Sequence, residues 1–178
     1  MVERRVLTLP GFMSSDAAHW QTVWEARYGF VRVEQEDWDE PSRSRWVKRL
    51  EHAIEQEQEP VVLVAHSLGC ALVAHAAKRI REQVAGALLV APADVDDAEH
   101  TPDAVRSFSP LPCKPLGFPA TVVASRNDPF IAFERAAHFA DCWQAKFVDA
   151  GAIGHINSDS ELGDWPEGLA LVRELRRA

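Results

Sequence analysis

Short runs of apolar residues recur along the chain, separated by more polar segments. They cover residues 6–9, 30–33, 61–65, 87–91, 121–124 and 146–148. Runs of this length that are rich in Val and Leu are typical of strands, because a buried helix is usually about ten or more residues long. The pattern therefore predicts six strands.

Between these runs, apolar positions recur with the spacing of one helix face. The segments concerned are residues 20–27, 46–54, 133–140 and 169–175. Residues 68–80 are apolar around most of the helix circumference, which predicts a buried helix. Strands that alternate with helices form βαβ units, so we expect an α/β fold, a mostly parallel sheet of about six strands with helices on both faces.

The length of the chain, 178 residues, is that of one domain. Apolar residues make up 47% of the sequence and charged residues 26%, which is typical of a globular protein and not of a disordered or collagen-like chain. The sequence contains no linker, repeat or low-complexity tract. We therefore expect residues 1–178 to form a single α/β domain.

Charge and hydropathy exclude two classes of partner. The formal net charge is −8, whereas nucleic-acid binding needs clustered Lys and Arg, so no nucleic-acid partner is expected. No apolar stretch approaches the roughly 20 residues of a membrane span. Residues 6–9 are followed by Pro10 before they reach the length of a signal-peptide core. We expect a cytoplasmic protein without a membrane partner.

The cysteines and the acidic residues do not indicate a metal site. Cys70, Cys113 and Cys142 are odd in number and widely spaced, and they form no CxxC pair, so we expect reduced thiols and neither disulfide nor zinc. The acidic stretch at residues 94–103 lacks the spacing of an EF-hand and is typical of a solvated loop. We expect no metal and no cofactor.

Ligands of α/β sheets bind beyond the carboxyl ends of the strands, so chemistry is expected in the loops that follow the strands. Ser67 follows the run 61–65 and precedes the buried helix, with the small residues Ala65 and Gly69 on either side. A serine in this strand-to-helix context is typical of a nucleophile elbow, although Ala65 stands where the usual motif has glycine. The alternative is that Ser67 only caps the helix.

A serine nucleophile needs a base that accepts its proton and an acid that orients the base. Asp128 follows the fifth apolar run, and His155 lies after the last one, in a loop with two glycines. Both residues therefore belong to the same sheet edge as Ser67. Taken alone, Asp128 is equally typical of a helix N-cap. Ser67, Asp128 and His155 are the candidate catalytic residues.

An acyl-transfer site also needs two backbone N–H groups that face the developing oxyanion. Leu68 supplies one as the residue after the nucleophile, and Phe12 is the candidate for the other because Gly11 lets the backbone turn inward. Met13 and Trp38 lie in loops at the same edge and are candidate pocket residues. For Trp38, packing in the core is the alternative.

Residues 92–119 form a long, Pro-rich stretch without clear periodicity. Loops of this length are usually functional lids or disordered. Because the stretch begins at the catalytic edge, Phe108, Leu111 and Leu116 could shape a shallow lid over Ser67, and the sequence leaves open whether the stretch acts as one.

Several motifs in combination are more specific than the elbow alone. They are Pro10-Gly11-Phe12 with His19-Trp20, Asp37-Trp38 with Trp46-Val47, His66-Ser67-Leu68-Gly69, Leu89-Val90-Ala91-Pro92-Ala93-Asp94, Ser125-Arg126-Asn127-Asp128-Pro129, and Gly154-His155-Ile156-Asn157 with Trp165-Pro166. With these motifs, nearly the whole chain resembles the small α/β-hydrolases that include YdeN-like proteins and the retinoblastoma-binding serine hydrolases. The resemblance implies a minimal α/β-hydrolase fold without a large cap domain and a triad at Ser67, Asp128 and His155.

Members of that family are described as serine hydrolases and are usually assayed as esterases. We therefore expect a serine hydrolase that cleaves small esters through an acyl-enzyme on Ser67. Two alternatives stay open, an amidase or peptidase with the same triad, and a non-catalytic protein-binding module on the same fold. The expected partner is a small-molecule ester or amide, and the sequence indicates no particular protein partner.

Overall fold

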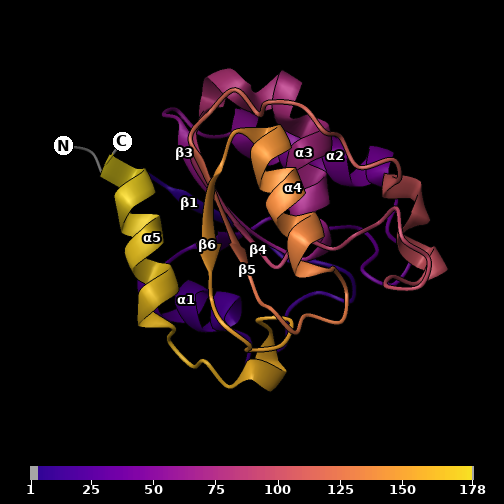
Figure 1. Ribbon diagram of the computed structural model, residues 1–178. Helices are drawn as coiled ribbons and strands as arrows, with labels where there is room; N and C mark the ends of the chain where they lie inside the picture. The colour runs from indigo at the N-terminus through magenta and orange to yellow at the C-terminus, as the bar shows by residue number, and fades with distance from the viewer. Residues whose placement is uncertain (1–3, 178) are drawn as a thin grey trace.

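A parallel sheet of six strands forms the centre of the computed structural model, which describes residues 4–177 (Figure 1). The strands are β1 (Val6–Leu9), β2 (Val31–Arg32), β3 (Val61–His66), β4 (Val84–Val90), β5 (Ala120–Ala124) and β6 (Lys146–Asp149). Their order across the sheet is β2-β1-β3-β4-β5-β6, and every neighbouring pair is parallel. The α/β fold and the six strands predicted from the apolar runs are confirmed.

Helices cover both faces of this sheet, with α1 and α5 on one face and α2, α3 and α4 on the other (Figure 1). The helices are α1 (Trp20–Tyr28), α2 (Arg43–Glu55), α3 (Leu68–Ile80), α4 (Phe133–Trp143) and α5 (Pro166–Arg177), with short 3-10 turns η1 (Arg81–Gln83), η2 (Asp103–Phe108) and η3 (Ser158–Ser160). Each helix falls where helical spacing predicts one. Within residues 4–177, none has both the length and the apolar character needed to cross a membrane.

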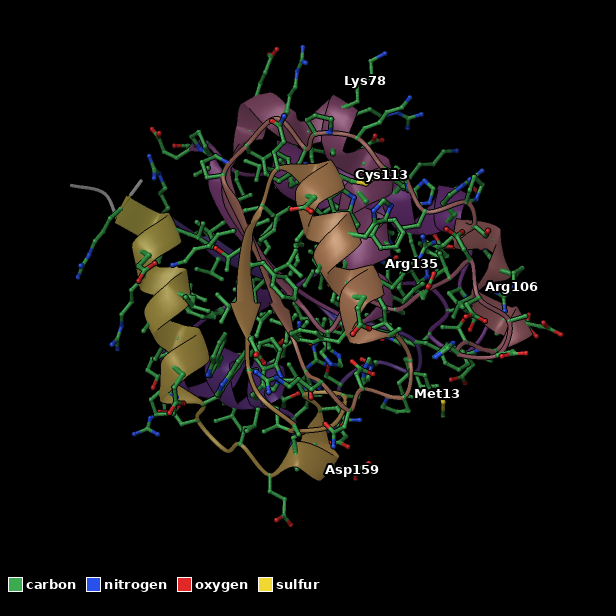
Figure 2. All side chains as sticks on the ribbon, in the orientation of Figure 1. Met13, Lys78, Arg106, Cys113, Arg135 and Asp159 are labelled. Atoms are coloured by element: carbon green, nitrogen blue, oxygen red, sulfur yellow. A yellow bond between two sulfur atoms is a disulfide. The ribbon has the colours of Figure 1, made fainter. Side chains whose placement is uncertain are left out.

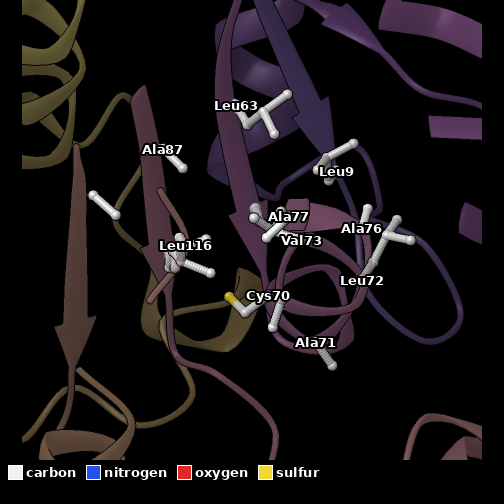
Figure 3. Packing of buried hydrophobic residues seen from close by; sticks show 14 of the residues in the cluster. Leu9, Leu63, Cys70, Ala71, Leu72, Val73, Ala76, Ala77, Ala87 and Leu116 are labelled. Carbon is white, nitrogen blue, oxygen red and sulfur yellow. The ribbon is translucent and has the colours of Figure 1, made fainter. Parts of the chain in front are cut away.

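Strand β3 is buried on both faces because it lies between the two helical layers. Its residues Leu63 and Ala65 belong to the core on the side of α2, α3 and α4, whereas Val62 and Val64 belong to the core on the side of α1 and α5. Figure 3 shows side chains of α3 in the first of these cores together with Leu63. An uninterrupted apolar strand is what this central position requires.

The edge strand β2 is shorter than the run 30–33 predicts, because it covers only Val31 and Arg32. It pairs with β1 alone, through Leu7 with Val31 and Thr8 with Arg32. Arg32 also forms an ion pair with Glu25 of α1 at 2.9 Å. The strand is therefore held partly by side-chain contacts to a helix and not by a second neighbouring strand.

Phe108, Leu111 and Leu116 do not form a lid, since all three are buried in the core on the α3 side. The turn η2 packs on α3, and the Nε2–H of His75 donates to the Phe108 carbonyl at 2.6 Å. The sequence of an irregular loop has no repeating apolar pattern, so it does not show whether an apolar side chain points toward the core or toward solvent. Here these side chains face inward and extend the core.

The cysteines also differ from the expectation of three reduced thiols. Cys113 and Cys142 form a disulfide with a Cα–Cα distance of 4.9 Å, and Cys70 is free and buried. The pairing arises because the chain after η2 runs back along the end of α4, where the Trp143 indole N–H donates to the Pro112 carbonyl at 2.7 Å. Cys113 and Cys142 are 29 residues apart, so only the tertiary fold brings them together.

Candidate active site

Ser67 occupies a strained turn between β3 and α3. Its backbone angles are φ 55° and ψ −119°, in the positive-φ region that residues other than glycine rarely adopt. Two neighbouring glycines leave space for the turn. A Cβ on Gly69 would overlap the carbonyl oxygen of Leu9, and a Cβ on Gly11 would lie 2.9 Å from the Ser67 Cβ. The backbone of β1 and its loop therefore presses directly against the turn.

The Ser67 side chain does not cap α3, although Ser67 stands at the N-cap position of that helix. No capping hydrogen bond links its hydroxyl to the helix backbone. Instead, Ser67 Oγ lies 2.9 Å from His155 Nε2. This contact and the strained backbone are the geometry of a nucleophile elbow and differ from those of an ordinary helix start.

Asp128 lies behind His155 and is almost fully buried. The Nδ1 atom of His155 is 2.9 Å from each carboxylate oxygen of Asp128. Because an ionised carboxylate can only accept, Nδ1 carries the proton and Nε2 is left as an acceptor toward Ser67. Asp128 does not cap α4, which begins at Phe133, but its Oδ1 accepts the Phe130 amide at 2.9 Å.

The loop that carries His155 is fixed by side chains from the loop after β5. Two successive amides, at residues 153 and 154, donate to Ser125 Oγ at 2.9 Å and to Asn127 Oδ1 at 2.8 Å. From the opposite side, the Nε2–H of His66 donates to the His155 carbonyl at 2.9 Å. The structure thus couples the acid loop, the elbow and the histidine loop through hydrogen bonds.

Two further histidines lie beside His155 and are buried. The rings of His19 and His66 are 4.7 Å apart between centroids, and those of His66 and His155 are 4.8 Å apart. Burial lowers the pKa of His19 to about 4 and the pKa of His66 well below its usual value. Both rings are therefore neutral at pH 7.

His19 is a functional candidate that sequence reasoning missed, because its place before Trp20 indicates only a helix start. Its Nδ1 accepts the amide of Gln21 at 3.1 Å, which puts the proton on Nε2. This Nε2–H is buried and has no hydrogen-bond partner within residues 4–177. His19 also lines the cavity described next. A buried unpaired donor at a cavity wall is a signal that only the tertiary structure reveals.

A cavity of about 270 Å³ opens over Ser67 and His155. Its lining comprises Gly11, Phe12, Met13, Ser14, Asp16, His19, His66, Ser67, Leu68, Ala93, Thr101, Pro102, Val105, Phe130, His155, Asn157, Ser158 and Asp159. The structure thus places Phe12, Met13 and Leu68 around Ser67. The position of a Cβ on Gly11 would be 3.0 Å from the backbone nitrogen of Leu68, so the loop before Phe12 lies against the start of α3.

Trp38 is not among the residues that line this cavity, which contradicts its role as a pocket residue. Its ring packs edge-on against Trp46 at 5.4 Å between centroids and contacts the core. Only its backbone reaches toward the site, where the Trp38 carbonyl accepts the Met13 amide at 3.0 Å. Trp38 therefore packs against the core, which is the alternative that the sequence left open.

The cavity wall is apolar with acidic groups at its rim. Phe12, Val105 and Phe130 are among the apolar residues that line it, whereas Asp16 and Asp159 are exposed. Figure 2 shows Met13 and Asp159 at the lower edge of the molecule. Among the described residues that line the cavity, none is a lysine or an arginine.

Residues 92–119 do border the site, but through residues other than those expected. Thr101, Pro102 and Val105, in and before η2, line the cavity. The carboxyl ends of β1 and β3 meet beside it, where the strand order reverses and where open α/β sheets bind their ligands. The loops after β1, β3, β5 and β6 carry Phe12, Ser67, Asp128 and His155, which together have the arrangement of an acyl-transfer site.

An elbow after a central parallel strand, followed by an acid loop and a histidine loop at the same sheet edge, defines the class of α/β-hydrolases. Comparison with known families agrees, because a profile described as serine hydrolase matches residues 6–174. The chain therefore belongs to the serine hydrolase family and is a hydrolase. Among curated protein sequences, no match was found.

Solved structures place the chain within this family more closely. A YdeN-like hydrolase from Pectobacterium atrosepticum is 32% identical with a TM-score of 0.87, covering 98% of this chain and 91% of its own. The ydeN gene product of B. subtilis is 18% identical with a TM-score of 0.76, covering 98% and 100%. A monoacylglycerol lipase from Paleococcus ferrophilus shares the fold at 16% identity and a TM-score of 0.68, covering 97% and 93%. The expected family, small YdeN-like serine hydrolases, is confirmed.

Proposed function

We propose that the protein hydrolyses small carboxylic esters through an acyl-enzyme formed on Ser67. The observation that carries this proposal is the continuous chain of contacts from Asp128 through His155 to Ser67, each 2.9 Å long. A serine that only stabilised a turn would need neither the strained backbone nor a histidine held by a buried carboxylate. The same residues support nucleophilic catalysis of acyl transfer.

In the first half of the reaction, Ser67 Oγ attacks the acyl carbon of the ester while His155 Nε2 takes the hydroxyl proton. Asp128 holds the imidazole with its proton on Nδ1 and stabilises the imidazolium that forms. When the tetrahedral intermediate collapses, Nε2–H gives its proton to the departing alcohol oxygen. The acyl group stays on Ser67 as an ester.

In the second half, His155 Nε2 accepts a proton from a water molecule, which attacks the acyl carbon. The carbon–Oγ bond then breaks, Oγ takes the proton back from His155, and the carboxylic acid leaves. In both halves the developing oxyanion is stabilised by the backbone N–H groups of Phe12 and Leu68. An oxyanion donor of this kind contributes about 3–4 kcal/mol when it is preorganised.

The cavity favours an ester with an apolar group of modest size and without negative charge. Its volume is about 270 Å³, near the lower end for small-molecule sites, and its inner wall carries Phe12, Val105 and Phe130. An anionic group would meet the carboxylates of Asp16 and Asp159 without a lining cation to neutralise it. Neutral and cationic esters with short or medium acyl chains are therefore the proposed substrates.

The test combines covalent labelling with turnover. The wild-type protein is treated with a fluorophosphonate and its intact mass is measured, and hydrolysis of p-nitrophenyl acetate is followed in parallel. One adduct per chain on Ser67 is expected. Ser67→Ala should abolish both labelling and turnover, whereas Asp128→Asn should lower turnover by a factor of the order of 10⁴, as loss of the acid does in serine proteases.

Ser44→Ala is the matched control, because Ser44 is an exposed serine at the start of α2 and does not line the cavity. It should label and turn over like the wild type. Circular dichroism and urea unfolding confirm that each variant is folded. A folded wild-type protein that forms no adduct would contradict the proposal and would favour a binding role for the same cleft.

A further inference from the structure

A second group of reactive side chains lies on the surface at the end of α4, outside the cavity. Cys113, His138 and Cys142 each offer one ligand atom, and these atoms all lie within 4.8 Å of one another. Cys113 and His138 are exposed and Cys142 is partly buried. Figure 2 shows Cys113 beside the upper part of α4, well separated from Met13 and Asp159 at the lower edge. None of the three lines the cavity.

Two elements bring these side chains together. His138 and Cys142 are four residues apart on α4, so they project from the same face of the helix. Cys113 comes from the segment that crosses the end of this helix, and the bond from the Trp143 indole N–H to the Pro112 carbonyl fixes that crossing next to Cys113. The cluster therefore rests on a helix and a clamped segment, and not on a free loop.

The distances from the imidazole suit a tetrahedral metal. His138 Nε2 lies 3.6 Å from Cys142 Sγ and 3.9 Å from Cys113 Sγ. In a zinc site with the usual Zn–S and Zn–N bond lengths, the edge between a sulfur and a nitrogen ligand is about 3.6 Å. Nε2 is thus already placed at ligand distance from both sulfurs. Two thiolates and one imidazole are ligands that Zn²⁺ prefers.

The two sulfurs are bonded to each other in this structure, so they cannot bind a metal in this state. A dithiol reductant changes this: it gives two electrons and two protons, the S–S bond breaks, two thiols form, and the dithiol becomes a cyclic disulfide. The sulfurs must then separate to about 3.8 Å, the edge between two sulfurs of a zinc site. Zn²⁺ then displaces one proton from each thiol.

We propose that the reduced protein binds one Zn²⁺ ion through Cys113, His138 and Cys142, with water as the fourth ligand. The disulfide and the metal site are then two alternative states of the same three residues. A disulfide oxidant closes the site: it takes two electrons from the two thiolates, the S–S bond forms again, the oxidant leaves as two thiols with two protons from solvent, and Zn²⁺ is released, whereas reduction opens the site. This proposal is independent of the chemistry at Ser67, because no residue is shared between the two sites.

The test is metal binding by native mass spectrometry on the full chain. The protein is reduced with dithiothreitol, freed from the reductant without oxygen, and mixed with one equivalent of Zn²⁺. One bound zinc per chain is expected for the reduced protein and none for the oxidised protein. With Co²⁺ in place of Zn²⁺, the reduced protein should show the thiolate-to-cobalt charge-transfer absorption that two sulfur ligands give.

Competition with a chromophoric zinc chelator then measures the contribution of each ligand. Cys113→Ser/Cys142→Ser should lose zinc binding, and His138→Ala should weaken it at least tenfold while it keeps both cysteines. His52→Ala is the matched control, because His52 is an exposed histidine on another helix, α2, and its loss should leave zinc affinity unchanged. Urea unfolding verifies that the variants are folded.

Two results would overturn the proposal. Reduced wild-type protein could retain no more zinc than the double serine variant, in which case the cysteines form only a structural disulfide. Alternatively, His138→Ala could bind zinc as tightly as the wild type, and the histidine would then not be a ligand.

Discussion

At the scale of single residues, the geometry of the Ser67 turn depends on two glycines, which have no side chain. Gly69 and Gly11 let the backbone of β1 and its loop reach the turn that holds Ser67. The motif around Ser67 could be predicted from sequence, because Ala65 and Gly69 are close to it along the chain, whereas Gly11 comes near it only through the fold. The buried donor of His19 could not, since its unpaired state depends on which residues surround it in space.

The first prediction concerns Gly69→Ala, for which helix propensity and packing have opposite effects. Alanine is favoured over glycine inside a helix by about 1 kcal/mol. Here the added Cβ overlaps the Leu9 carbonyl, so we expect a net loss of about 3 kcal/mol in the free energy of unfolding. Urea denaturation measures the difference.

Gly86→Ala provides the comparison for this experiment. A Cβ on Gly86 would lie 3.0 Å from the end of the Leu175 side chain, which can move aside, and 3.3 Å from the Pro119 carbonyl oxygen, a much milder backbone contact than the overlap at position 69. We expect a loss clearly smaller than that of Gly69→Ala. Equal losses for the two variants would show that the contact with Leu9 is not what restricts position 69.

The second prediction concerns the stability of the protein in acid. The unfolded chain binds a proton at His19 near pH 6.5, whereas the folded chain does so only near its pKa of about 4. Stability is therefore fully present above pH 6.5 and falls as the pH is lowered toward 4, by up to about 3 kcal/mol from this residue. His66, whose pKa burial also lowers, acts in the same direction.

The measurement is the free energy of unfolding at several values between pH 7.5 and 4.5. In His19→Asn the side chain can still accept the Gln21 amide, as asparagine does at helix N-caps, but it does not titrate. Its stability should therefore fall less steeply with decreasing pH than that of the wild type. Parallel curves would mean that His19 does not control the acid sensitivity.

At the scale of elements, α4 is joined to the rest of the molecule by contacts that cannot be predicted from the sequence pattern. Asp94, in a stretch expected to be solvated, is buried and forms an ion pair with Arg135 of α4 at 2.9 Å. Near the other end of α4, Cys142 is bonded to Cys113. Helical spacing predicts that α4 exists because that pattern is local. Its partners come from distant segments and could not be predicted.

The third prediction is that the disulfide stabilises the fold. Its removal frees a loop of 29 residues in the unfolded chain, which corresponds to about 3–4 kcal/mol of stability. Wild-type protein should therefore unfold at lower urea concentration when a reductant and a metal chelator are present. Cys113→Ser/Cys142→Ser should be insensitive to the reductant, and if it responded as the wild type does, another group would be the target.

At the scale of the whole molecule, the order of the strands decides where chemistry can occur. From β1 the chain adds β2 on one side of the sheet and β3 to β6 on the other, so the direction of strand addition reverses between β1 and β3. The loops after these two strands carry Phe12 and Ser67. The position of the site could be predicted because alternating strands and helices already imply a parallel sheet. The shape of the cavity could not, since Thr101, Pro102 and Val105 enter it from a stretch without periodicity.

The acidic rim of the cavity also acts beyond the range of contact. The chain carries a net charge of −8, and a hydrogen bond from Ser158 lowers the pKa of Asp16, which keeps that carboxylate ionised. The resulting negative potential should speed the diffusional encounter with a cationic ester and slow that with an anionic one. Raising the salt concentration from about 10 mM to 150 mM shortens the Debye length from about 30 Å to 8 Å, and should therefore lower kcat/KM for the cation and raise it for the anion. If kcat/KM for both esters responded alike to salt, long-range attraction would have no part in substrate choice, and selection would rest on fit within the cavity alone.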